Sequence, residues 1–212
     1  MSEIAQTTKE RIIEVAGEIF GKEGFKAATI RKIAQAANAN VAAINYYFRD
    51  KEGLYSAVLE DVFSKGFEKF PSNFGFKDGM SSEEKLKAFI QSMFYRLLSH
   101  EGWAGIHGKG KLIAKEILNP TPAFEGIVEK YIKPHKEVLA SIISDMLGDK
   151  ASIDKVLPCI ISVIGQCLYY AYATQIIQRI AQEYMPGEEN LNFLAEHVWK
   201  FSLGGIEKIK SS

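Results

Sequence analysis

The amino-acid sequence predicts an all-α fold, and three observations support this. Apolar residues recur at intervals of three and four along almost the whole chain, which is the period of an amphipathic helix. No segment shows the strict alternation of a half-buried strand. Helix-capping pairs also recur, as in Thr7 with Glu10 and Ser81 with Glu84. A chain of 212 residues, 47% hydrophobic and 25% charged, is long enough and apolar enough to bury a helical core.

The first helix is predicted to begin after Thr7 and to end at Gly21 and Gly24. Its inward-facing residues are Ile12, Ile13, Ala16, Ile19 and Phe20. Thr29 then caps a short helix whose apolar positions are Ile30, Ile33, Ala34 and Ala37.

A tight turn of three residues, "NAN", separates this short helix from the next. Asn38 is expected to adopt the left-handed conformation that ends a helix, and Asn40 is expected to cap a second short helix over residues 41–48. A longer helix should start near Asp50. Its inner face is predicted to carry Leu54, Val58, Leu59 and Val62.

Two short helices joined by a tight turn and packed on a first helix describe a helix-turn-helix motif, here at about residues 29–48. In that motif the second helix enters the major groove of DNA. Ala42 and Ala43 are small enough to approach thymine methyl groups, and Asn45 can pair with adenine. Tyr46 and Tyr47 can reach phosphates. The same pattern also fits a short helical hairpin with a solvated charged face, and the residues alone leave that alternative open.

The charge of the chain favours DNA binding only around the helix-turn-helix motif. The chain carries 26 Lys and Arg against 26 Asp and Glu, so it has no net attraction for nucleic acid. Around the motif, cations outnumber the two acidic residues Glu23 and Asp50. These cations are Lys22, Lys26, Arg31, Lys32, Arg49 and Lys51.

The stretch "TIRKIAQAANANVAAINYYFRDKEGLY" resembles the DNA-binding signature of the TetR family, and the similarity covers about residues 7 to 62. The resemblance implies a dimeric, all-helical, ligand-responsive regulator whose last two helices form the dimer interface. It implies phosphate contacts for Thr29 and Lys51, and backbone contacts for Tyr46 and Tyr47. The residues that it places facing the bases are Asn40, Val41, Ala42, Ala43 and Asn45.

Two positions depart from the family pattern. Asn38 stands where the family often has Gly, and Asn45 replaces a frequent Tyr. The stretches "KEILNPTPAF" and "IGQCLYYA" in the C-terminal half are similar to the CecR-like branch of the family.

A loop, "PSNFGFKDGMSS", follows Phe70 and marks the predicted domain boundary, with a DNA-binding domain at 1–66 and a ligand-binding and dimerisation domain at 67–212. Five helices are predicted in the second domain. They cover about residues 82–99, 103–118, 123–147 with a kink at Pro134, 153–184 with Pro158 best tolerated in the first turn, and 191–208.

The run from Val156 to Ile177 is apolar over about the length that spans a bilayer. Polar residues punctuate it, and no clear asymmetry of charge flanks it, so we expect a helix buried against its own core and a second subunit. No membrane partner is expected, and the polar N-terminus "MSEIAQTTKER" predicts a cytoplasmic protein.

A sensor domain needs a cavity with aromatic walls and a few polar groups. The predicted effector is a small apolar or aromatic molecule, and plain core packing is the alternative role for each aromatic residue. The candidate lining residues are Phe94, Trp103, His107, Phe124, Tyr131, Gln166 and Tyr170.

Other site chemistry is not expected. His100, His107 and Glu116 could suggest a metal, but nearby glycines argue against a rigid helix that would align them, so neither metal nor cofactor is predicted. Cys159 and Cys167 lie in an apolar run and are expected to be buried and reduced. Phosphate-loop, HExxH and GxSxG motifs are absent, so the protein is not predicted to be an enzyme.

The sequence therefore predicts a one-component regulator, a repressor that binds a palindromic DNA operator as a homodimer. The alternative is a helical dimeric ligand-binding or interaction protein that has lost DNA binding.

Overall fold

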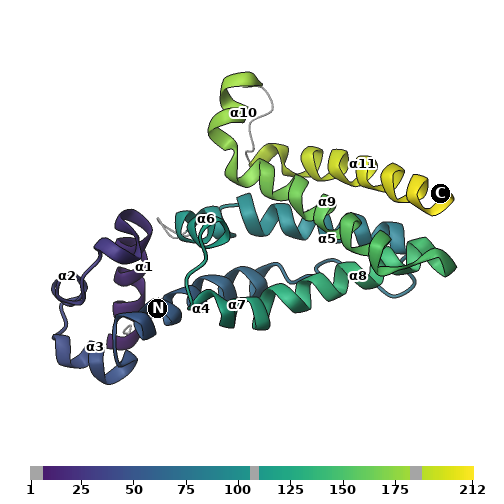
Figure 1. Cartoon of the computed structure of the whole chain (residues 1–212). Helices are drawn as coiled ribbons and strands as arrows, with labels where there is room; N and C mark the ends of the chain where they lie inside the picture. Colours follow the sequence, from purple (N-terminus) through teal and green to yellow (C-terminus); the bar gives the residue numbers. More distant parts are fainter. Residues whose placement is uncertain (1–6, 106–109, 182–187) are drawn as a thin grey trace. The chain divides into compact units, whose positions relative to one another are not determined.

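The computed structural model of the chain describes residues 7–105, 110–181 and 188–212. Every regular element in these ranges is helical, which confirms the predicted all-α class (Figure 1). The chain divides into two compact units. The first comprises Met1–Lys65 with Ile106–Lys130, and the second comprises Gly66–Gly105 with Tyr131–Ser212. Residues 106–130 thus join the N-terminal unit, whereas the functional boundary at residue 66 stays a prediction.

The first unit starts with α1 (Thr8–Ala27), and its predicted capping box is present. The Thr7 hydroxyl accepts a hydrogen bond from the Glu10 backbone N–H, and the Glu10 carboxylate accepts one from the Thr7 N–H. Gly24 has φ +83°, a conformation that L side chains rarely adopt, and it interrupts the helix where an end was predicted, although α1 continues to Ala27. Gly21 does not end the helix and is buried within it.

The helix-turn-helix of the first unit consists of α2 (Ile30–Ala36) and α3 (Val41–Phe48), followed by α4 (Lys51–Lys69). The last residues of α4 belong to the second unit. The core of the first unit is built from aliphatic and aromatic side chains with no exposed surface, and Ile13 and Ile19 are half-buried at its margin. These core residues are Ile12, Ala16, Phe20, Ile33, Ile44, Leu54, Val58, Leu59 and Val62.

Two further helices, α6 (Gly110–Leu118) and α7 (Phe124–Ile127), complete the first unit. The Lys115 ammonium donates to the Gly21 carbonyl of α1 at 2.9 Å. On the other side of α6, the buried Glu116 carboxylate accepts hydrogen bonds from the Tyr55 hydroxyl at 2.5 Å and from the Thr121 backbone N–H and hydroxyl, each at 3.0 Å. These bonds tie α6 to both α1 and α4.

The second unit is a bundle of four long helices, α5 (Ser82–Leu98), α8 (Lys133–Leu147), α9 (Ile153–Tyr172) and α11 (Leu191–Ser211) (Figure 1). Helix α11 packs on α5, α8 and α9. The short helix α10 (Thr174–Ile180) extends from the end of α9. The predicted capping box of Ser81 and Glu84 opens α5.

Two predicted helices are interrupted in the structure. Over 103–118, a 3₁₀ turn (η1, Trp103–Gly105) precedes α6, which begins only at Gly110. Over 123–147, α7 is followed by a π-helical turn (η2, Val128–Ile132) before α8 begins. Pro134 lies in the first turn of α8 and has no N–H to donate back along the chain, so the backbone widens there instead of continuing as one kinked α-helix.

The predicted helix over 153–184 is also divided, because α9 ends at Tyr172 and α10 follows Ala173. The Thr174 hydroxyl donates to the Ala171 carbonyl at 3.0 Å, and this side-chain bond competes with the regular backbone ladder. The end predicted at Tyr184 lies outside the described residues. Pro158 is inside α9, beyond its first turn, so the helix accommodates the loss of one backbone bond.

Candidate nucleic-acid interface and effector site

The turn between α2 and α3 has the geometry that its asparagines predict. Asn38 has φ +45°, so it is the left-handed residue that ends α2. The Asn40 side-chain oxygen accepts a hydrogen bond from the Ala43 N–H at 2.6 Å and caps α3. Ile44 and Phe48 are buried in the first unit and fix the rotation of α3.

The opposite face of α3 is exposed and carries the residues predicted to read or approach DNA. Tyr46 is 84% exposed, and its ring lies edge-on to Tyr47 with 5.2 Å between centroids. Ala43 is half-buried. The remaining predicted residues at this surface, all exposed, are Asn40, Val41, Ala42, Asn45 and Tyr47.

The two predicted phosphate contacts flank α3. The Thr29 hydroxyl oxygen accepts a hydrogen bond from the Lys32 N–H at 3.2 Å, which leaves its own hydrogen available to an acceptor. The Lys51 ammonium lies 3.3 Å from the Lys26 carbonyl oxygen and 4.5 Å from the centroid of the Phe25 ring. Because an ammonium has three N–H donors, Lys51 can hold these contacts and still bind a phosphate.

Arg49 is a further candidate that the sequence reasoning named only among the local cations. Its side chain is 91% exposed, and its nearest acidic partner is Asp50 at 3.9 Å. Its φ is +71°, an uncommon conformation for a residue with a side chain, and one that costs conformational energy. Lys32 is paired with Glu23, whereas Lys22, Lys26 and Arg31 are exposed at the surface.

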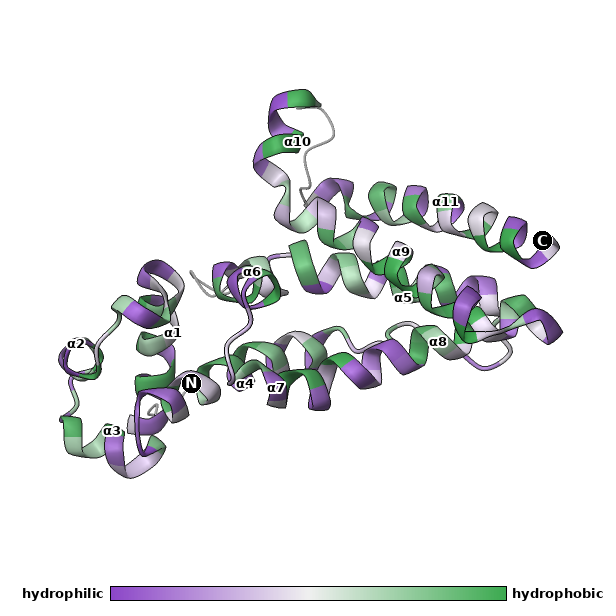
Figure 2. Ribbon diagram, in the orientation of Figure 1, coloured by the Kyte–Doolittle hydropathy of each residue, from purple (hydrophilic) through white to green (hydrophobic). Residues whose placement is uncertain are grey.

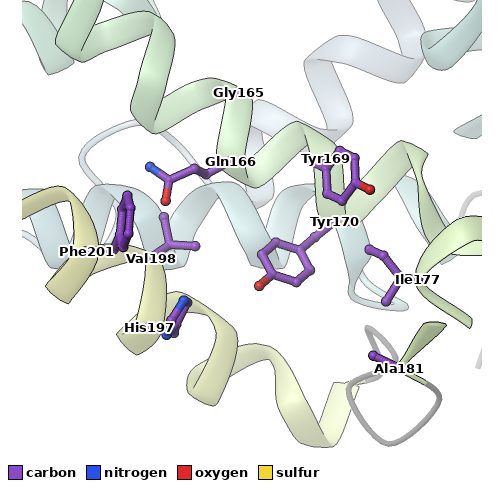
Figure 3. A pocket seen from close by; sticks show the side chains of 9 residues that line it. All are labelled: Gly165, Gln166, Tyr169, Tyr170, Ile177, Ala181, His197, Val198 and Phe201. Carbon is purple, nitrogen blue, oxygen red and sulfur yellow. The ribbon is translucent and has the colours of Figure 1, made fainter.

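In the second unit, an open cavity of about 560 Å³ lies between α9 and α11 (Figure 3). Gln166, Tyr169 and Tyr170 reach it from α9, while His197, Val198 and Phe201 reach it from α11. Gln166 also donates a hydrogen bond to the Ser202 hydroxyl at 3.2 Å. Two predicted pocket residues, Gln166 and Tyr170, thus line one cavity.

The other predicted pocket residues lie elsewhere. Phe94 is buried behind Tyr170, with 5.7 Å between ring centroids. Trp103 and Tyr131 both contact Phe67, with centroid separations of 5.9 Å and 5.4 Å. Phe124 packs on Phe63 in the first unit, and His107 lies outside the described residues.

Sequence reasoning did not single out Arg96, which is 2% exposed at the centre of the cluster around Phe67. The available signal was its position on the inner, otherwise apolar face of α5, three residues after Met93. A charged residue in that phase is uncommon and often functional.

Within the described ranges, no group of three or more His, Cys, Asp or Glu residues could hold a metal ion. The Glu116 carboxylate accepts hydrogen bonds from Tyr55 and Thr121. Cys159 and Cys167 are buried and free, as predicted, and burial raises the pKa of both thiols.

A helix-turn-helix with an exposed second helix, followed by a separate helical bundle, defines a one-component type of transcriptional regulator. Comparison with protein families agrees. The model of "Bacterial regulatory proteins, tetR family" matches residues 12–58, and that of "HTH-type transcriptional dual regulator CecR, C-terminal domain" matches residues 82–206. The chain therefore belongs to the TetR family of bacterial transcriptional regulators and has a C-terminal domain of the CecR type.

Individual relatives point the same way. The Probable HTH-type transcriptional regulator YttP of Bacillus subtilis is 27% identical over 172 residues, which are 78% of this chain and 77% of YttP. The dual regulator CecR of Shigella flexneri is 27% identical over 180 residues, 81% and 79% of the two chains. A crystal structure of FadR from Bacillus subtilis in complex with stearoyl-CoA shares the fold, with a TM-score of 0.66, 18% identity and coverage of 92% and 97%. All three are named as transcriptional regulators.

Proposed function

We propose that this TetR-family regulator is a ligand-responsive repressor that binds a palindromic operator as a homodimer and is released by a small apolar or aromatic effector. The observation that carries the DNA-binding part is the exposed face of α3. Ile44 and Phe48 anchor that helix, while Ala42, Asn45, Tyr46 and Tyr47 are exposed and Ala43 is half-buried. Such a helix is free to enter a major groove.

The proposed contacts follow from exposure and chemistry. Asn40, Val41, Ala42, Ala43 and Asn45 face the bases, because small side chains permit close approach and an amide can pair with adenine. The backbone phosphates are contacted by Thr29, Tyr46, Tyr47 and Lys51.

We propose that the homodimer forms through α9 and α11. Ile161 is 64% exposed on α9, and Phe201 is 67% exposed on α11. Large apolar side chains exposed together along two adjoining helices mark an interaction surface. Each helix continues this face at four-residue intervals. The series are Ile153, Leu157, Ile161, Gly165 and Tyr169 on α9, and Phe193, His197, Phe201 and Gly205 on α11. A Cβ built at Gly165 or Gly205 would meet nothing within 4 Å, so these two positions leave space for a partner helix.

Helix α9 is also the one described helix that is long and apolar enough, by length and composition, to cross a membrane. Only 22% of its apolar window is buried within the chain. The hydropathy colouring in Figure 2 shows apolar stretches along both α9 and α11. We propose that a second subunit, and not a membrane, covers this face. The chain belongs to a family of DNA-binding regulators. In addition, a hydrogen bond between Gln166 and Ser202 joins α9 to α11. The same reasoning favours the cytoplasm as its location.

The cavity between α9 and α11 opens on this same face, since Tyr169 and Phe201 line it. A partner subunit would therefore close this cavity.

We propose that the effector binds in the second unit and favours a conformation in which the two recognition helices no longer fit the groove spacing. A coupling of about 1 to 3 kcal/mol between effector and operator is typical of such control.

A salt titration of binding to random duplex DNA tests the proposed function against the alternative of an interaction protein without DNA affinity. Neutralised phosphates release counterions, so the logarithm of the affinity should fall steeply and linearly with the logarithm of the salt concentration. Absence of measurable affinity even at low salt would favour the alternative.

A further inference from the structure

Arg96 of α5 is a buried cation with an unsatisfied hydrogen-bond donor. Its Nη2 donates to the Ser92 hydroxyl at 3.3 Å, whereas its Nη1 has no hydrogen-bond partner among the residues that the structure describes. The guanidinium carbon lies 4.0 Å from the centroid of the Phe67 ring and 6.0 Å from that of Trp103. In the part of the chain that the structure describes, no carboxylate forms an ion pair with this guanidinium.

The neighbouring ionisable groups do not neutralise Arg96. Burial raises the pKa of the Cys167 thiol to about 12, so this group stays protonated and uncharged near neutral pH. Burial and then the Arg96 charge hold the pKa of His135 well below its ordinary value, so His135 is neutral too. Burial lowers the pKa of Arg96 itself to about 9, which still leaves it charged at pH 7.

A buried charge of this kind destabilises a fold unless something pairs with it. Among residues 7–105, 110–181 and 188–212, Arg96 has only a hydroxyl and two aromatic faces as partners. Aromatic faces attract a cation but cannot accept the N–H bond that Nη1 offers in the plane of the guanidinium. An anionic acceptor in the plane of the guanidinium would satisfy this donor and balance the charge at the same time.

The shell around the guanidinium is aromatic. Phe67 contacts Trp103, Tyr131 and His135, with 5.5 Å between the Phe67 and His135 ring centroids. Phe89 stacks on His135 at 4.4 Å. Apolar walls around a single oriented charge are typical of a site for a molecule with an anionic head and an apolar body.

Two residues of this aromatic shell reach the surface. Phe67 and Tyr131 are only half-buried, so the cluster reaches the surface of the second unit. The Trp103 indole lies against Gly66, where a Cβ would come within 2.0 Å of the indole Nε1. Gly66 therefore permits the present position of Trp103 next to the guanidinium.

We propose that Arg96 binds the carboxylate of the effector, and that the effector is an organic monocarboxylate with an aromatic or aliphatic body. Binding of a carboxylate by Arg96 does not depend on the proposed function, whereas the role of this ligand as the effector does. A carboxylate matches the guanidinium fork with two parallel hydrogen bonds. One negative charge balances Arg96, whereas a phosphate dianion would leave an excess charge in a site with few polar groups.

Fluorescence of Trp103 reports on this site directly. The chain has two tryptophans, so a Trp199→Phe background leaves Trp103 as the single one. The probes are benzoate, phenylacetate, hexanoate and decanoate, each paired with its primary amide, which has nearly the same shape but no charge. At least one carboxylate should change Trp103 emission saturably, with a Kd at least about tenfold below that of its amide. Equal affinities for every pair, or no saturable response to any carboxylate, would overturn the proposal.

Variants assign the effect to Arg96. Arg96→Met removes the charge at similar volume, so it should abolish the difference between acid and amide while keeping or raising the melting temperature of the free protein. Lys85→Met on the same helix is the matched control and should retain the difference. Two results would show that Arg96 is not the anion-binding residue. The first is an Arg96→Met protein that still prefers the carboxylate. The second is an Arg96→Met protein with a lower melting temperature, together with a Lys85→Met protein that has also lost the preference.

Gly66→Ala supplies a second test that leaves Arg96 in place. Alanine is acceptable in a helix, but its methyl group must displace the Trp103 indole. Trp103 emission should therefore shift in the free protein, and carboxylate affinity should change by about fivefold or more. Unchanged emission and affinity would refute this location of the site.

The outcome separates this inference from the proposed function. Carboxylate binding through Arg96 by a protein without DNA affinity would refute the proposed regulator and keep the anion site. DNA affinity without any carboxylate response would refute the anion site and keep the regulator.

Discussion

Asn45 and Tyr47 are both exposed on α3, but they should contribute differently to DNA binding. Asn45→Ala should relax preference at a single base pair and cost about 1 to 3 kcal/mol there if its contact is bidentate. Tyr47→Ala should weaken binding to all sequences alike, because a phosphate contact positions the protein without reading bases. Affinities measured on specific and random duplexes check both expectations. Equal losses on the two duplexes for Asn45→Ala would show that Asn45 reads no base.

His135 should make the stability of the fold depend on pH. It is buried, its Nδ1 lies 2.6 Å from the Ser72 hydroxyl oxygen, and burial with the facing Arg96 keeps its pKa well below the usual value. As the pH falls through about 6.5, the His135 imidazole therefore takes up a proton in the unfolded chain but stays neutral in the folded chain. The contribution of His135 is complete above that pH and is lost as the pH falls, by up to about 1.4 kcal/mol per unit.

Thermal unfolding between pH 7.5 and pH 5.5 measures this slope. His135→Gln should flatten it, since glutamine can still contact Ser72 but does not titrate. His197→Gln changes an exposed histidine and should leave the slope as it is in the original protein. A slope that persists in His135→Gln would contradict the assignment.

At the scale of the element, α6 should stabilise the first unit chiefly through Glu116. Glu116→Ala leaves the Tyr55 hydroxyl and the Thr121 donors without their acceptor, so it should lower the free energy of unfolding by about 2 to 4 kcal/mol. Glu116→Gln retains one acceptor oxygen and should cost less. Denaturant unfolding of both variants gives the comparison, and a loss in Glu116→Ala no larger than in Glu116→Gln would contradict this role for the carboxylate.

The elements that sequence predicts well are those with local signals. The capping boxes of Thr7 and Ser81 mark the starts of their helices, and Asn38 and Asn40 define the tight turn. These signals are readable in the sequence because each side chain acts on backbone groups within a few residues. The π-helical turn before α8 and the break at Ala173 were missed. Periodicity continues across both interruptions, so the pattern of apolar residues does not reveal them.

The candidate sites show the same division. The burial of Ile44 and Phe48, four residues apart on α3, is readable in the sequence, whereas the exposure of Val41, which has the same helical phase, is not. The cluster of Phe67, Trp103, Tyr131 and Arg96 joins residues far apart in the chain, and its members could not be grouped from spacing alone. Sequence reasoning named Trp103 and Tyr131 as candidate pocket residues by their aromatic chemistry, but it did not place either of them beside Phe67 or Arg96.

At the scale of the whole molecule, the face formed by α9 and α11 should determine the oligomeric state. Ile161→Glu and Phe201→Glu each place a charge in the proposed interface and should convert the dimer into a monomer, because a buried unpaired carboxylate is costly. Ile180→Glu, an exposed residue of α10 outside the two stripes, is the control. Sedimentation equilibrium distinguishes the outcomes, and dimers that persist in both interface variants would place the interface elsewhere.

The central claim is that two copies of α3 read an inverted repeat, and selection of binding sites from a random pool of duplex DNA tests it most directly. Two-fold symmetry requires the recognition helices to enter major grooves on one face of the duplex, so the half-site centres should lie about 34 Å apart or at a multiple of that distance. The account predicts enrichment of such repeats by the original protein and none by Ala43→Glu, whose carboxylate would face the DNA. Enriched sites without an inverted repeat, or no enrichment at all, would contradict it.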